Sequence, residues 1–127
     1  MIGSGKFEKS IINFEKALKR MEDVLLEQET SIVRDATIQR FEFTYELMWK
    51  TLKVFMEDIH GIRTVSPRQV FKEAFSLSLI EDEEIFLDMI QSRNKMSHTY
   101  NEDQANEIYQ KCPSYLGAMK GVFEKIS

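Results

Sequence analysis

Apolar residues recur at steps of three and four along most of the chain, the spacing that places them on one face of a helix. In the first segment they are Phe7, Ile11, Phe14, Leu18, Met21 and Leu25. The polar stretch 27–31 interrupts this pattern and offers Thr30 or Ser31 as the cap of the next helix. The first segment is therefore predicted to be a long amphipathic helix.

The second apolar pattern is longer and ends at Gly61. Its stripe consists of Ile38, Phe41, Tyr45, Met48, Trp49, Leu52, Phe55, Met56 and Ile59. Phe43, Leu47 and Val54 lie off this stripe. A helix that is apolar on more than one side must be covered on more than one side, so this is predicted to be the central helix of a bundle or to carry a subunit interface. Core packing is the favoured role for its aromatic rings, ahead of base stacking.

Two shorter helices are predicted next. Ser66, Pro67 and Gln69 supply a capping hydroxyl, a proline in the first turn and a capping-box amide for a helix through 70–75. The acidic run 81–84 opens the following helix, where negative charge meets the positive end of the helix dipole. One stripe of that helix holds Phe86, Met89, Ile90, Arg93, Met96 and Tyr100, which puts a cation in an apolar row.

The last segment is predicted to be a helix capped by Asn101, with Gln104 as its capping-box partner. Its stripe is Ala105, Ile108, Cys112, Tyr115, Met119, Val122 and Ile126. Pro113 falls inside it and is expected to kink or split the helix. The whole pattern predicts a single all-α domain over residues 1–127, an antiparallel bundle of four or five helices.

Composition supports this fold and narrows the function. The 127 residues are 43% hydrophobic with only five Gly and two Pro, too few turn formers for a β-sandwich or barrel. A net charge of -4 excludes a strongly basic, non-specific nucleic-acid coat but leaves room for a local basic site. One cysteine, Cys112, and two histidines provide neither a disulfide nor a zinc set, and the single Glu-x-x-His at Glu57 and His60 is half of what a helical di-iron site needs, so no cofactor or metal is expected.

A cytoplasmic protein is the simplest expectation, with no membrane among its partners. The lone cysteine is typical of a reducing compartment. The sequence contains no 18-residue apolar run, and its first ten residues lack the apolar stretch of a signal peptide.

Candidate chemistry gathers between Arg93 and Tyr100. At about 100° per residue, Arg93 and Tyr100 are predicted to lie on one stripe of this helix, and Asn94 and His98 are neighbours four residues apart. A guanidinium, an amide, an imidazole and a phenol would then lie at one helix end. The residues alone favour a plainer interpretation, in which Arg93 forms an inter-helix ion pair and His98 is a helix-end residue.

A family resemblance favours a functional role for these residues over the plainer interpretation. Arg93, Asn94, His98 and Tyr100 match the Arg-x4-His-x-Tyr motif of the HEPN superfamily. Nearly the whole chain resembles the nucleotidyltransferase substrate-binding proteins of the HepT-like branch. The blocks that carry the resemblance are RDATIQRFEFTYELMWKTLK at 34–53, SPRQVFKEAF at 66–75, RNKMSHTYNED at 93–103 and YQKCPSYL at 109–116.

The resemblance implies a bundle that forms a homodimer and is encoded beside a minimal nucleotidyltransferase. In the HepT-like branch it implies a toxin, a metal-independent ribonuclease, restrained by transfer of AMP to the motif tyrosine, here Tyr100. Other family members are described only as substrate-binding subunits.

The residues suit RNA cleavage without a metal. The 2′-OH of RNA can attack the adjacent phosphate if a base, an acid and a cation are supplied. His98 can serve as base or acid, and a two-fold dimer would provide both roles and would also cover Arg93 in its apolar row. Arg93 would hold the phosphate, Asn94 would orient His98 or the phosphate, and Lys95 would add positive field. AMP on Tyr100 would block the groove and repel RNA.

Three functional hypotheses follow. The first is an endoribonuclease toxin with its active groove at the dimer interface. The second is a non-catalytic subunit that docks with the nucleotidyltransferase and uses Arg93, His98 and Tyr100 as polar contacts; the acidic net charge favours it slightly. The third is a structural bundle that has no partner.

Overall fold

The computed structural model describes residues 5–97 and 100–127, and His98 of the predicted site lies outside them. These residues form five α-helices and no strand, which confirms the predicted all-helical bundle. The helices are α1 (Gly5–Leu25), α2 (Ser31–His60), α3 (Pro67–Ser76), α4 (Glu83–Ser97) and α5 (Glu102–Ile126).

Local hydrogen bonds explain where α2 begins and ends. The Thr30 hydroxyl accepts a hydrogen bond from the Val33 N–H at 3.1 Å, which satisfies one of the N–H groups that the first turn of a helix leaves without a partner. Gly61 ends the helix in the left-handed conformation, with φ 67°. Glycine adopts this conformation without steric cost because it has no Cβ.

The other predicted caps are present. The Ser66 hydroxyl accepts a hydrogen bond from the Gln69 N–H, whereas the Gln69 side chain accepts one from Val65 N–H instead of closing a capping box on Ser66. Asn101 and Gln104 form the full capping box predicted at the start of α5. An Asp82 carboxylate oxygen accepts from the Glu84 N–H and fixes the start of α4.

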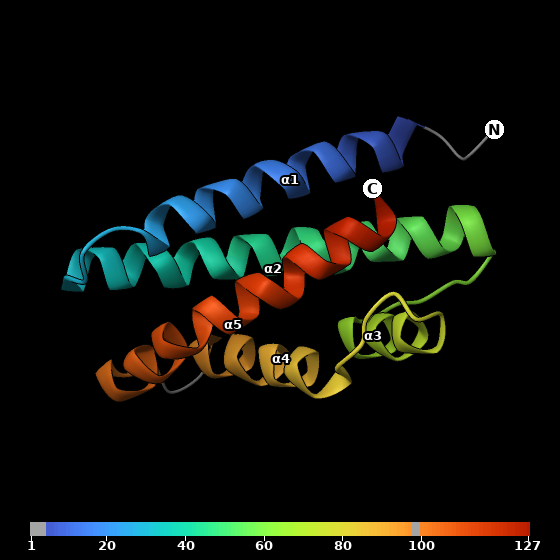
Figure 1. Cartoon of the computed structure of the whole chain (residues 1–127). Coiled ribbons are helices and arrows are strands. Elements are labelled where there is room, and N and C mark those ends of the chain that lie inside the picture. The colour runs from blue at the N-terminus through green and yellow to red at the C-terminus, as the bar shows by residue number, and fades with distance from the viewer. Residues whose placement is uncertain (1–4, 98–99) are drawn as a thin grey trace.

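The long helix α2 is the centre of the bundle, as the second apolar pattern predicted. It packs against α1, α5 and α3, while α4 lies between α3 and α5 (Figure 1). Its stripe residues Phe41, Tyr45, Met48, Leu52 and Met56 are fully buried. The Phe41 ring stacks on the Tyr115 ring of α5, with 4.9 Å between centroids. The aromatic stripe of α2 therefore forms the core.

Off the stripe, α2 is only partly covered. Leu47 and Val54 are half-buried, whereas the side chain of Phe43 is 60% exposed. An apolar ring this exposed on the central helix leaves open the second role predicted for it, a subunit interface.

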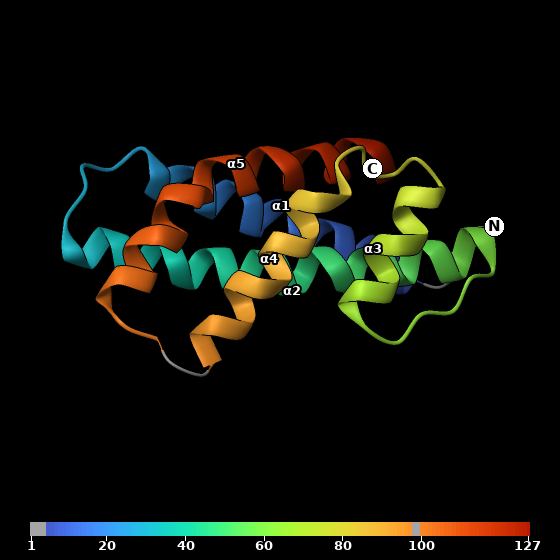
Figure 2. The same ribbon diagram turned by 90° about the horizontal axis from the view of Figure 1, so that it is seen from below.

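Pro113 does not split α5, which continues to Ile126, although its path is bent in Figure 2. The prediction that Tyr100 continues the stripe of Arg93 is wrong, because α4 ends at Ser97 and Tyr100 is not helical. Asn101, the cap of α5, has extended backbone angles, so the chain must leave the helical conformation before it.

None of the described helices is long and apolar enough to cross a membrane.

Candidate functional site

Arg93 on α4 is held by two carboxylates of α2. Its Nε lies 2.9 Å from Glu42 Oε2 and 3.6 Å from Glu46 Oε1. The buried Nε–H finds no acceptor at a hydrogen-bonding angle among the described residues, so this contact is charge pairing rather than a directed bond. The plainer interpretation of Arg93, an inter-helix ion pair, is confirmed. A dimer is therefore not needed to explain a cation in an apolar row.

Arg93 and Asn94 line one open groove, which lies between α2, the start of α3 and the end of α4. The groove has a volume of about 620 Å³ and is lined by Tyr45, Glu46, Arg68, Arg93, Asn94 and Ser97, among others. Arg93 Nη1 donates a 2.5 Å hydrogen bond to Ser97 Oγ, which fixes the guanidinium at the groove wall. The structure thus brings together two of the predicted site residues.

Lys95 faces another direction. Its Nζ lies 3.7 Å from Glu107 Oε1 on α5, and Lys95 is not among the described residues that line the groove of Arg93. Successive helix residues point about 100° apart, so Arg93 and Lys95 cannot both face α2. His98, the predicted acid or base, cannot be placed relative to either because it lies outside the described residues.

Tyr100 borders a second, smaller groove. Its side chain is 42% exposed, and the groove, of about 310 Å³, is also lined by Asp35, Glu42 and Met96. Burial raises the pKa of the Tyr100 phenol, and the negative charge of Asp35 raises it further, while the nearby Arg34 guanidinium opposes them. Because Glu42 both lines this groove and pairs with Arg93, the two candidate regions adjoin at one carboxylate.

Glu42 and Glu46 are site residues that sequence reasoning missed. They stand four residues apart on α2, each directly after a fully buried aromatic residue of the stripe, Phe41 and Tyr45. Glu46 also accepts a 3.1 Å hydrogen bond from the Trp49 indole N–H. The sequence does contain a signal for this pairing. Two acids border the apolar stripe of α2, and one cation, Arg93, lies inside the apolar row of α4.

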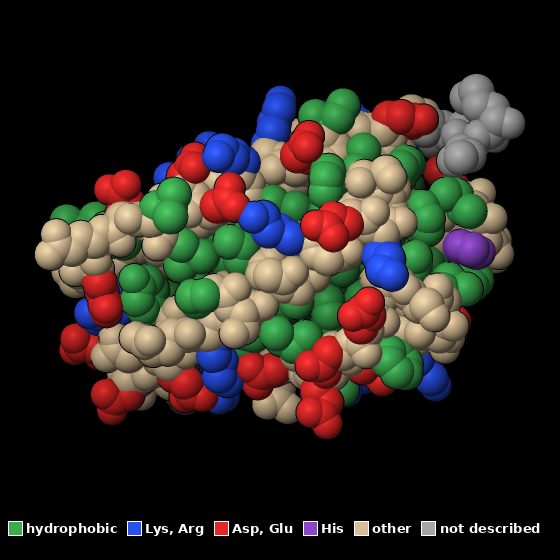
Figure 3. Space-filling view, viewed as in Figure 1, with side chains coloured by type: hydrophobic (Ala, Val, Ile, Leu, Met, Phe, Trp, Pro, Cys, Tyr) green, Lys and Arg blue, Asp and Glu red, His purple; other side chains and the backbone are tan. Residues whose placement is uncertain are grey.

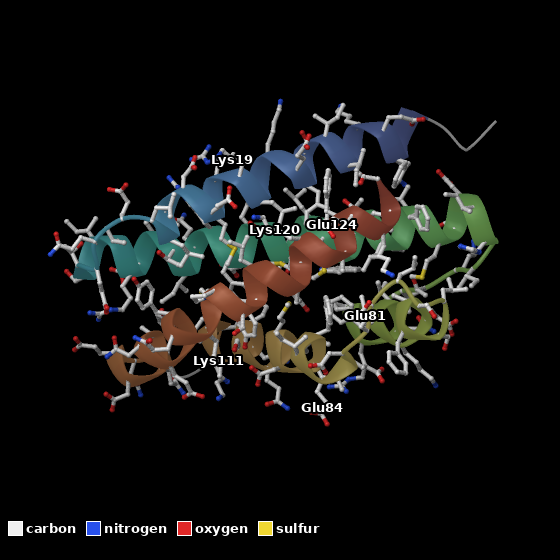
Figure 4. All side chains as sticks on the ribbon, viewed as in Figure 1. Lys19, Glu81, Glu84, Lys111, Lys120 and Glu124 are labelled. Atoms are coloured by element: carbon white, nitrogen blue, oxygen red, sulfur yellow. The ribbon has the colours of Figure 1, made fainter. Side chains whose placement is uncertain are left out.

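A polar network joins α4 to α5 beside Arg93. The Tyr115 hydroxyl donates a 2.5 Å hydrogen bond to Asp88 Oδ2, so Ser92 Oγ is the donor of the 2.8 Å bond between Ser92 and Tyr115. Lys111 Nζ lies 3.0 Å from Asp88 Oδ2, and Figure 4 shows Lys111 at the junction of the two helices. Ser92 is the residue before Arg93, so this network joins α4 to α5 at the level of the candidate site.

The contacts within this network shift the pKa values of its three titratable side chains. Burial by itself raises the pKa of Asp88, but hydrogen bonds from Tyr115 and Lys111 and the positive charge of Lys111 outweigh burial and leave the pKa lowered. Burial lowers the pKa of Lys111, and its bond and attraction to Asp88 outweigh that effect and raise it. Burial raises the pKa of the Tyr115 phenol, and the bond to Asp88 adds to this. Asp88 and Lys111 are thus both ionised at neutral pH.

Charges of both signs alternate over the face shown in Figure 3. Acidic and basic side chains are interspersed along α1 and α5 on this face, and apolar side chains lie between them. Among the described residues, no group of three or more His, Cys, Asp or Glu side chains is arranged to hold a metal ion. The thiol of Cys112 is buried in the core, and burial raises its pKa to about 12.

Residues 5–127 match the family model described as nucleotidyltransferase substrate binding protein like. The chain belongs to this family. A probable ribonuclease HepT from Haemophilus influenzae is 30% identical over 98 residues, which cover 71% of this chain and 67% of the relative. The family resemblance predicted from the sequence is thereby confirmed.

Two solved structures have a fold similar to that of this chain. A crystal structure of a Thermus thermophilus protein has a TM-score of 0.83 and 34% identity, over 89% of this chain and 98% of that one. A Haemophilus influenzae structure, described as the fold of a substrate binding domain of a nucleotidyltransferase, has a TM-score of 0.68 and 21% identity, over 96% and 97% of the two chains. At that identity, the second similarity shows a shared fold.

Proposed function

We propose that this member of the nucleotidyltransferase substrate-binding family is the ribonuclease toxin of a pair whose antitoxin is a minimal nucleotidyltransferase encoded nearby. One observation carries the proposal: Arg93 and Asn94 line one open groove that adjoins an exposed Tyr100. The 30% identity to a probable ribonuclease HepT supports it.

In this proposal Arg93 binds the RNA phosphate at the groove wall. A guanidinium has five N–H donors in a planar fork, and its contacts with Glu42, Glu46 and Ser97 leave capacity for a phosphate oxygen. His98 transfers protons to and from the RNA oxygens, Asn94 orients His98 or the phosphate, and Lys95 adds positive charge. A homodimer supplies one His98 as base and the other as acid.

Transfer of AMP to Tyr100 would silence this activity. The Tyr100 phenol is exposed, so a nucleotidyltransferase can reach it. An added nucleotide would place a bulky anion next to Glu42, the residue that pairs with Arg93, and would exclude an RNA phosphate by volume and charge.

Purified variants test the catalytic roles. His98→Ala and Arg93→Ala should each abolish cleavage of a labelled RNA and growth arrest on expression, while circular dichroism shows unchanged helicity. Arg63→Ala is the matched control, because the Arg63 side chain is 87% exposed and pairs only weakly, at 3.9 Å, with Glu57. Wild-type cleavage by both site variants would contradict the nuclease proposal.

A second candidate function is a non-catalytic subunit that docks with the nucleotidyltransferase. The pairing of Arg93 with Glu42 and Glu46 favours it, because two carboxylates already balance the charge that would attract RNA. In this case the purified protein shows no nuclease activity at any concentration, and it co-purifies with the nucleotidyltransferase in a fixed ratio.

A further inference from the structure

Arg34 is a largely buried cation at the start of α2 with weak partners. Its side chain is 18% exposed, and it extends the buried stripe of Ile38 and Phe41 by one turn. Its Nε lies 3.7 Å from Glu29 Oε2, and its Nη1 lies 3.8 Å from Glu102 Oε1. Both distances exceed a hydrogen bond, and the Glu102 side chain is 85% exposed.

These contacts are poor compensation for burying a guanidinium. Arg34 Nε is inaccessible to water, and no described residue accepts a hydrogen bond from it. A buried donor without an acceptor is costly, and ion pairs with well-exposed carboxylates contribute little. An anion bound to the remaining guanidinium donors would offset the cost of burying the charge, so Arg34 is suited to bind an anionic ligand.

Arg34 stands one turn before Ile38, a residue that lines the Tyr100 groove. Its ion-pair partner Glu102 is two residues after Tyr100, and the next residue on α2, Asp35, lines the Tyr100 groove. The charge of Arg34 also acts on the Tyr100 phenol, whose pKa it lowers against the larger effects of burial and Asp35. The ion pair with Glu102 and the position one turn before Ile38 therefore place Arg34 at the edge of the Tyr100 groove.

We propose that Arg34 is a phosphate-binding residue that holds the phosphate of a nucleotide at the Tyr100 groove, first during its transfer to Tyr100 and then as the phosphodiester. The inference rests on the proposed modification of Tyr100. A planar guanidinium matches two oxygens of a phosphate, and the groove of about 310 Å³ is lined by Ile38, one turn after Arg34, and by Glu42, the partner of Arg93.

The transfer step exchanges one phosphorus–oxygen bond for another. The Tyr100 Oη forms a bond to the α-phosphorus of a nucleoside triphosphate, and the bond from that phosphorus to the oxygen bridging to the β-phosphorus breaks. Pyrophosphate leaves with the electron pair of the broken bond, and the phenolic proton passes to water. Arg34 stabilises the charge on the α-phosphate oxygens throughout, so it positions the phosphate without exchanging a proton.

Nucleotide titration tests the binding directly and needs no nucleotidyltransferase. In a ¹H–¹⁵N spectrum of arginine side chains, the Arg34 Nε–H signal, assigned by its loss in Arg34→Lys, should shift saturably with AMP and stay in place with adenosine. An Arg34 signal that does not respond to millimolar AMP overturns the inference.

The transfer reaction gives a second, independent readout. With the nucleotidyltransferase and ATP, Arg34→Gln should take up AMP roughly ten- to a hundredfold more slowly than wild type, as loss of a charged hydrogen bond predicts. Arg34→Lys should recover part of the rate, and Arg63→Gln should be modified normally. Modification of Arg34→Gln at the wild-type rate overturns the inference.

The two proposals fail separately. If the wild type neither cleaves RNA nor accepts AMP, the proposed function is wrong, while a saturable shift of the Arg34 signal still establishes a nucleotide phosphate site. If the wild type is active and modified but Arg34→Gln behaves in the same way, the function stands and the role of Arg34 is wrong.

Discussion

At the scale of single residues, the charge of Arg93 is balanced before any ligand arrives. Glu42 and Glu46 approach its Nε to 2.9 and 3.6 Å, and these side chains are each about one third exposed. A phosphate that binds Arg93 must therefore compete with two carboxylates at a partly buried position, where charge interactions are stronger than in bulk water. If Arg93 binds RNA as proposed, this pairing weakens the binding.

Removing one of these carboxylates should strengthen RNA binding. We expect Glu42→Gln to bind an uncleavable 2′-O-methyl RNA roughly three- to tenfold more tightly, because one repulsive charge is lost and Arg93 is less neutralised. Fluorescence anisotropy at low ionic strength measures this change.

Glu57→Gln is the control for that experiment, since Glu57 pairs with Arg63 near the end of α2, about four turns after Glu42. Equal or weaker RNA binding by Glu42→Gln would show that Arg93 does not receive the phosphate.

Sequence reasoning found Arg93 but not its partners, for a physical reason. A cation in an apolar row is visible in the sequence, whereas its pairing with Glu42 depends on how α2 and α4 are rotated about their axes. That rotation is set by packing of the whole core. Arg34 was missed because the apolar stripe of α2 begins at Ile38, one turn after it.

At the scale of helices, the residues at which a helix begins or ends could be predicted where a capping residue lies next to that helix end. Thr30, Ser66 and Asn101 cap their helices through hydrogen bonds that span three residues, and Gly61 ends α2 with positive φ. The end of α4 was not predicted, because the apolar spacing continues to Tyr100 while the cap of α5 requires extended chain. The mutual position of Arg93 and Tyr100 therefore could not be derived from periodicity.

Two glycines allow a measurement of how much the left-handed conformation of Gly61 matters for stability. Gly61→Ala should lower the free energy of unfolding by about 1 kcal/mol, because alanine is strained at φ 67°. Gly117→Ala, inside α5, should raise it by about 0.5–1 kcal/mol through helix propensity. A Cβ meets nothing within 4 Å at either position, so sterics cannot explain a difference.

Urea unfolding monitored by circular dichroism measures both variants. Equal effects of the two substitutions would contradict a conformational origin.

The stability that Asp88 contributes by joining α4 to α5 should depend on pH. The folded pKa of Asp88 is lowered, so its contribution to stability is present above its ordinary value of 3.8 and is lost as pH falls through the lowered value. At neutral pH, Asp88→Asn should cost about 1 kcal/mol, a value discounted because the Asp88 side chain is 37% exposed.

Unfolding free energies of wild type and Asp88→Asn should converge as the pH is lowered below 3.8. Asp58→Asn, which replaces an exposed acid on α2, serves as the control. A difference that persists unchanged in acid would mean that the carboxylate charge is not what holds the helices together.

At the scale of the whole molecule, one face has the features that a two-fold interface requires. Phe43 protrudes beside a hollow of about 620 Å³ between α1 and α2, whose lining includes Ala17 and Ala36. The same hollow carries Arg20 and Arg40 as well as Glu42 and Glu46. A two-fold axis brings each patch against itself, so a protrusion with a hollow and charges of both signs make the patch self-complementary.

If the proposed homodimer uses this face, Phe43→Glu should convert it to a monomer. A buried, unpaired carboxylate at each of two symmetric positions raises the dissociation constant by roughly a hundredfold or more. Sedimentation equilibrium measures the change. Phe75→Glu on α3, where the ring is 46% exposed, should leave the dimer intact. A Phe43→Glu protein that remains dimeric would place the interface elsewhere.

The hydrogen bond between Trp49 and Glu46 couples the intrinsic fluorescence of the protein to the candidate site. Trp49 is the one tryptophan in the sequence, and its indole N–H is bound to a carboxylate that lies 3.6 Å from Arg93 Nε. Any ligand that draws the guanidinium away from Glu46 also alters the polarity around the indole. Emission from the unlabelled protein should thus report occupancy of the Arg93 groove in real time, without attaching a dye.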